Sequence, residues 1–179
     1  MTTFRTILVV LFFSLPIGVQ SDEIEDARAQ LIAGLERCVL AIRAASPEPF
    51  SDLEGGYQND SRDRFSKGQW RSDDGAWEFR LKAYRPHKVL GCSVKRAGSG
   101  AVGDVDRTLI RLLDNADEIT LSGARFTVLI DRQGTLGRIR VHHSCDVRQE
   151  SVALYPDFAQ TSGRVRFSMS RNLFEKDAC

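Results

Sequence analysis

The chain has 179 residues, no large excess of either charge, and a single long apolar run close to its N-terminus. Its 25 basic and 24 acidic residues nearly balance, so no general attraction to nucleic acid is expected. Without a second apolar run of about 20 residues, no transmembrane segment is predicted beyond that run. The sequence also lacks the Gly-x-Ser-x-Gly turn of serine hydrolases and the Gly-rich phosphate loop that ends in Lys. No catalytic motif or cofactor is therefore predicted.

The apolar run, residues 6–19, has the layout of a secretory signal peptide. Arg5 gives it a basic start, and small or medium residues follow as far as Ser21, ahead of Asp22. An uncleaved anchor is the alternative, although the run is short for a membrane span. We expect residues 1–21 to be a signal peptide and residues 22–179 to form one domain that is periplasmic or secreted. Removal of residues 1–21, whose only charged residue is Arg5, would leave 24 basic and 24 acidic residues and a net charge of zero.

Four cysteines remain after the leader, which indicates two disulfides in an exported chain. Three connectivities are possible, and four reduced thiols are the alternative. Cys38 lies on the apolar stripe of a predicted helix and Cys92 on the apolar face of a predicted strand. Because those two faces should meet, we favour Cys38–Cys92, which leaves Cys145 to pair with Cys179.

Two amphipathic helices are predicted. In residues 22–45 the apolar residues recur every three or four positions. Residues 104–116 show the same spacing and begin with Asp104, a suitable N-cap. The apolar stripe of the first helix contains Ile24, Ala27, Leu31, Leu35, Cys38 and Ile42, and that of the second contains Val105, Leu109, Leu112, Leu113 and Ala116.

Between the first helix and the first clear strand, residues 46–69 predict a long irregular loop. The segment contains two prolines, a Gly-Gly pair and a charged run, and loops of this length are often functional. We expect Phe50, Leu53, Tyr57 and Phe65 to hold parts of it against the core.

Strands are predicted where apolar and polar residues alternate, with turns at Asp74-Gly75 and Gln133-Gly134. Such alternation is typical of an antiparallel sheet with one covered face and one wet face. The order helix, strands, helix, strands therefore predicts an α+β fold. We expect a two-layer domain, mostly antiparallel sheet, with both helices packed on one face.

The most reactive-looking cluster is His142-His143-Ser144-Cys145. Neighbouring residues of a strand point to opposite faces, so the two histidines should not converge on one ion. His143 and Cys145 share a face, but a structural zinc site needs about four ligands. No metal site is predicted. A small extracytoplasmic enzyme that uses this strand end and the long loop remains an alternative.

The strongest binding candidate is a basic sheet face. Polar faces of three predicted strands carry pairs of cations, which would line one wet surface if the strands share a sheet. Guanidinium groups bind carboxylates and phosphates bidentately, although an ordinary solvated face would have the same composition. The expected binding residues are Arg80, Lys82, Arg138, Arg140, Arg164 and Arg166.

Together these features predict an exported, disulfide-stabilised, non-enzymatic binding or accessory protein. The expected partner is an acidic protein, an anionic envelope polymer or a lipid head group, and nucleic acid is not expected in an exported context. Unpaired strand edges could alternatively dock a larger complex. The sequence does not define the oligomeric state.

Overall fold

The computed structural model describes residues 18–58, 65–84, 88–98, 103–134, 137–147, 150–158 and 165–171. Within these ranges there are two α-helices, one 3-10 turn and nine strands. The first half contains α1 (Gly18–Ala44), η1 (Glu48–Phe50), β1 (Glu54–Gln58), β2 (Phe65–Arg71), β3 (Trp77–Tyr84) and β4 (Lys88–Arg96). The second half contains α2 (Asp104–Asn115), β5 (Glu118–Leu121), β6 (Ala124–Gly134), β7 (Gly137–Val147), β8 (Glu150–Phe158) and β9 (Val165–Arg171).

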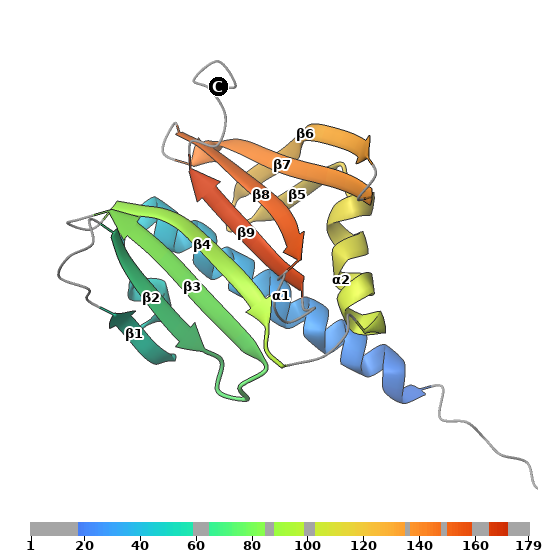
Figure 1. Cartoon of the computed structure of the whole chain (residues 1–179), viewed down its shortest axis with the longest axis horizontal. Coiled ribbons are helices and arrows are strands. Elements are labelled where there is room, and N and C mark those ends of the chain that lie inside the picture. The colour runs from blue at the N-terminus through green and yellow to red at the C-terminus, as the bar shows by residue number, and fades with distance from the viewer. Residues whose placement is uncertain are drawn as a thin grey trace, which may run out of the picture.

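All nine strands pair antiparallel in one sheet of order β1-β2-β3-β4-β9-β8-β7-β6-β5. Each half is a helix followed by a meander of strands, and the halves meet where β4 pairs with β9 (Figure 1). At this seam Ser93 lies opposite Ser168 and Cys92 opposite Met169. The predicted α+β class and its helix–strands–helix–strands order are confirmed.

Both helices pack on the same face of the sheet and contact each other (Figure 1). From α1, Leu31, Leu35 and Ile42 are buried against apolar side chains of the sheet, and Leu109 and Leu113 of α2 are buried as well. Arg96 of β4 pairs with Glu23 of α1 and with Asp106 of α2, which ties the helix layer to the sheet. The apolar stripes predicted for the helices are therefore their buried faces.

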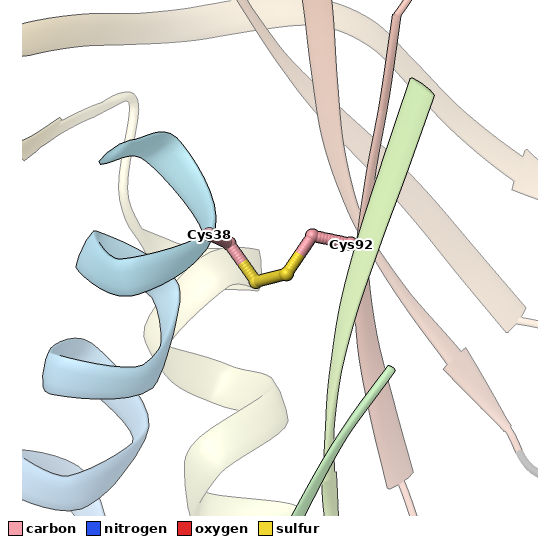
Figure 2. The surroundings of a disulfide bond; sticks show 2 residues. All are labelled: Cys38 and Cys92. Atoms are coloured by element: carbon pink, nitrogen blue, oxygen red, sulfur yellow. A yellow bond between two sulfur atoms is a disulfide. The ribbon is translucent and has the colours of Figure 1, made fainter. Parts of the chain in front are cut away.

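A disulfide joins the two layers. Cys38 on α1 is bonded to Cys92 on β4, with Cα atoms 5.5 Å apart (Figure 2). The predicted pairing of these two residues is confirmed. Cys145 is also disulfide-bonded, and its expected partner Cys179 lies outside the described residues.

Of the irregular loop expected over residues 46–69, the structure describes 46–58 and 65–69, and for these residues the expectation is wrong. This stretch contains η1, β1 and the first residues of β2. Phe50 is fully buried, with its ring centroid 5.4 Å from that of Trp70. The sequence of β1, Glu-Gly-Gly-Tyr-Gln, lacks strand alternation, so this strand exists because it pairs with β2. Leu53 and Tyr57 pack on the core as expected, whereas the side chain of Phe65 is outside the described part.

The helix α1 begins at Gly18, inside the segment predicted as a leader, and residues 1–17 lie outside the described ranges. Of the helices described, none is both long enough and apolar enough to cross a membrane.

Candidate functional site: a basic groove on the open face of the sheet

The face of the sheet opposite the helices contains a groove that crosses the seam between β4 and β9. The groove has a volume of about 510 Å³ and is lined by residues of β2, β3, β4, β8 and β9. This volume lies within the range of about 300–1,000 Å³ that is usual for small-ligand sites. The side chains that line the groove are short at its centre and long at its margins.

Strand register explains this shape. One row across the open face runs through Gln69, Arg80, Ser93, Ser168 and Tyr155, which are successive cross-strand partners. Serines occupy the two central strands of this row, while an arginine and a tyrosine flank them. The short side chains leave room above the strands, and the long ones form the walls.

A second row, two residues along the strands, runs through Lys67, Lys82, Gly91 and Ser170. Gly91 contributes no side chain to the floor, and a Cβ added there would lie 3.3 Å from the backbone oxygen of Met169. Glycine therefore keeps the floor low at this position.

Four cations line the groove: Lys67, Arg80, Lys82 and Arg166. Among the lining residues that the structure describes there is no Asp or Glu. The buried Nε of Arg166 has no hydrogen-bond partner. The groove thus concentrates positive charge beside a guanidinium whose hydrogen-bonding capacity is not fully used.

Like charges also lie directly opposite each other here. Lys67 faces Lys82 across β2 and β3, and Lys95 faces Arg166 across β4 and β9. Such pairs are destabilising unless an anion neutralises them. Acidic residues flank this second pair in the register, since Glu78 is opposite Lys95 and Asp157 is opposite Arg166. The oxygens of Glu78 also lie 3.6 Å from Arg80 and 3.9 Å from Arg71. Glu78 offsets part of the positive charge at that end of the groove.

Of the six predicted binding residues, the structure brings Arg80, Lys82 and Arg166 together in the groove. The placement predicted for Arg140 is wrong. Arg140 is 5% exposed and lies on the helix side, where Nη1 donates to Asp114 O at 2.6 Å and Nη2 to Asp117 Oδ1 at 2.7 Å. The side chain of Arg138 and the whole of Arg164 lie outside the described part.

The reason for this error is that β7 is buried on both sides from Arg140 to Ser144. Val141 and His143 are nearly as buried as Arg140 and His142. Alternation of residue type therefore does not show which side of β7 faces the helices. A guanidinium is long enough to reach the exposed carbonyls at the end of α2, which makes a buried arginine acceptable there.

Residues Lys67, Ser93, Ser168 and Ser170 were missed as site residues. A polar side chain on the wet face of a strand is common, so none of them carries a signal by itself. The alternation Arg166, Ser168, Ser170 on β9 does show that short polar residues face outward on one strand. Only the pairing of β9 with β4 brings them beside Ser93.

The alternative site at His142–Cys145 is not assembled. His142 Nε2–H donates to Ala116 O at 2.9 Å on the helix side, and His143 lies on the other face, with Nδ1 3.9 Å from Cys145 Sγ. Burial lowers the pKa of both histidines below 6.5. Because Cys145 is disulfide-bonded, it offers no thiolate as nucleophile. The predicted divergence of the two histidines is confirmed.

Comparisons with protein-family models, with curated proteins and with solved structures find no match for this chain.

Proposed function

We propose that this chain is an exported, disulfide-stabilised, non-enzymatic binding protein that holds an anionic partner in the basic groove. The observation that carries the proposal is a concave lining with four cations and no carboxylate among its described residues. An anion in the groove would accept bidentate hydrogen bonds from the guanidinium groups of Arg80 and Arg166.

Rigid surroundings support the same proposal. The groove lies over the middle of the sheet, and below it Cys92 is bonded to Cys38 of α1. The cations of β3 alternate with the buried residues Phe79, Leu81 and Ala83. A scaffold of this kind holds its charges in place before the ligand arrives, so less entropy is lost on binding.

A charge-reversal experiment tests the groove. We expect native mature protein to bind soluble anionic polymers, with an affinity that falls as salt rises. Arg80→Glu/Arg166→Glu should abolish this binding. The matched control, Arg28→Glu/Arg132→Glu, makes the same change in net charge at positions outside the groove and should retain it. Equal binding by both variants, or no binding of an anionic polymer by native protein, would contradict the proposal.

Export is a separate part of the proposal, supported by the leader-like residues 1–21 and by the Cys38–Cys92 disulfide. Expression of the full chain in a bacterial host, followed by N-terminal sequencing of the periplasmic protein, tests it. We expect a mature chain that begins at Asp22. Full-length protein that stays in the cytoplasm with reduced cysteines would contradict it.

A further inference from the structure

We infer that the partner held in the groove is a segment of an acidic polysaccharide, an inference that rests on the function proposed above. The groove is not merely cationic. It combines charged groups at its margins with hydroxyl groups across its floor. The charged groups would bind the acidic groups of a ligand, and the hydroxyls would bind its polar uncharged groups.

The hydroxyl floor consists of Ser93, Ser168 and Ser170 on the two central strands. Ser93 and Ser168 lie directly opposite each other, which places their Cβ atoms about 5 Å apart. Both are partly exposed within the groove. Each hydroxyl donates one hydrogen bond and accepts two, as the hydroxyl groups of a sugar do. A pair of serines this close can therefore bind adjacent sugar hydroxyls.

The cations lie at one side of this floor, on β3, and at one end of it, on β9. Arg80 is on β3, next to Ser93, and Arg166 is on β9, two residues before Ser168. With strands about 4.8 Å apart, the β3 and β9 cations are separated by roughly 10 Å across the sheet. A chain that carries an acidic group on successive sugar units can reach both the β3 cations and Arg166 while its hydroxyls lie over the serines.

Aromatic side chains lie at two ends of the same face. Tyr155 ends the row that contains both serines, and Tyr84 follows Lys82 by two residues on β3, with 45% of its surface exposed. A tyrosine ring combines a flat apolar surface with a polar tip, which suits the apolar face of a sugar ring.

An acidic peptide fits this groove less well. Peptides that bind sheets commonly add a strand at an open edge, with pockets for alternate side chains. Here the groove crosses interior strands, whose backbone groups already pair with their neighbours from β2 to β8. Its floor carries the hydroxyls of three serines. Recognition must therefore come from side chains that match a polar, hydroxyl-rich ligand.

The test compares three ligands of equal length by isothermal titration calorimetry: an oligogalacturonate, its neutral methyl ester, and an oligoglutamate. We expect the oligogalacturonate to bind more tightly than either of the others. Ser93→Ala/Ser168→Ala removes two hydroxyls and no charge, so it should weaken oligogalacturonate binding about tenfold and leave oligoglutamate binding unchanged. Ser51→Ala, an exposed serine outside the groove, is the control and should bind as native protein does.

A groove-filling variant gives a second readout. Ser168→Phe keeps every cation and occupies the floor, so oligogalacturonate binding should be lost while the urea unfolding midpoint stays near the native value. If oligoglutamate binds as tightly as oligogalacturonate and the serine variants change nothing, the saccharide inference is overturned and the anionic-partner proposal stands. If no anionic ligand binds native protein, both are overturned.

Discussion

Arg171 on β9 donates a hydrogen bond from Nη2 to the backbone oxygen of Ile42, at a distance of 2.6 Å. Ile42 lies near the C-terminal end of α1, where carbonyl groups lack partners within the helix. Arg140 makes the equivalent contact at the other helix, since its Nη1 donates to Asp114 O and Ala116 O at the end of α2. Both helices therefore end against a buried guanidinium that projects from the sheet.

Replacing Arg140 tests this role. Arg140→Met removes the charge and the hydrogen bonds to the carbonyls of Asp114 and Ala116, of which Ala116 O keeps the one from His142. We therefore expect about 3 kcal/mol of lost unfolding free energy. Arg132→Met, at an exposed position on the neighbouring strand β6, should change stability by less than about 0.5 kcal/mol. Urea unfolding followed by circular dichroism measures both. Anion binding should survive in Arg140→Met, because that residue is outside the groove; equal stability of the two variants would refute the capping role.

The buried histidine His142 predicts a dependence of stability on pH. Burial lowers its pKa below 6.5, so in the unfolded chain it takes up a proton that the folded chain rejects. The unfolding free energy should therefore fall as pH drops below about 6.5 towards the lowered pKa of the folded state. His143 shifts in the same direction. In His142→Asn, urea midpoints between pH 7.5 and 5.5 should show a shallower slope than in native protein; parallel slopes would show that His142 does not contribute.

Loss of the Cys38–Cys92 disulfide should destabilise the fold without changing its architecture. The bond spans 54 residues of sequence, and restricting a loop of that size in the unfolded chain is worth about 4 kcal/mol. Cys38→Ala/Cys92→Ala should therefore lower the urea midpoint substantially and retain the far-ultraviolet spectrum of native protein at low urea. A midpoint unchanged from native protein would argue that the layers gain nothing from the bond.

The adjacent glycines of β1 should respond differently to alanine. Gly55 has φ +145°, and a Cβ there would lie 2.2 Å from the backbone oxygen of Gln69, so Gly55→Ala should cost more than about 2 kcal/mol and detach β1. At Gly56 a Cβ would meet nothing within 4 Å, so Gly56→Ala should be nearly neutral. Hydrogen exchange of residues 54–58 together with urea unfolding distinguishes the two. The same response at both positions would count against the close backbone approach at Gly55.

Much of this fold could be predicted from local patterns, because the apolar stripes of α1 and α2 and the alternation in β3 and β9 each reflect a single buried face. The disulfide between Cys38 and Cys92 followed from the same reasoning about which faces meet. The strand β1 could not be found in this way, since Gly55 and Gly56 have no side chains to show alternation.

The candidate site was only half predictable for a related reason. Arg80, Lys82 and Arg166 could be assigned to a wet face from their own strands. Their arrangement around Ser93 and Ser168 depends on the pairing of β4 with β9, which are about seventy residues apart in the chain. No local pattern encodes a contact over that separation.

The β4–β9 seam also imposes an order on the folding of the chain. During synthesis β4 is complete long before β9 emerges, and until then it is an outer strand with unpaired backbone groups. An unpaired strand edge can pair with the edges of other chains, so a partly synthesised chain is prone to aggregate. The groove itself comes into being only when the seam closes. A ligand that contacts β3, β4, β8 and β9 together would therefore bind only the folded molecule. Its binding would stabilise the pairing of the two halves.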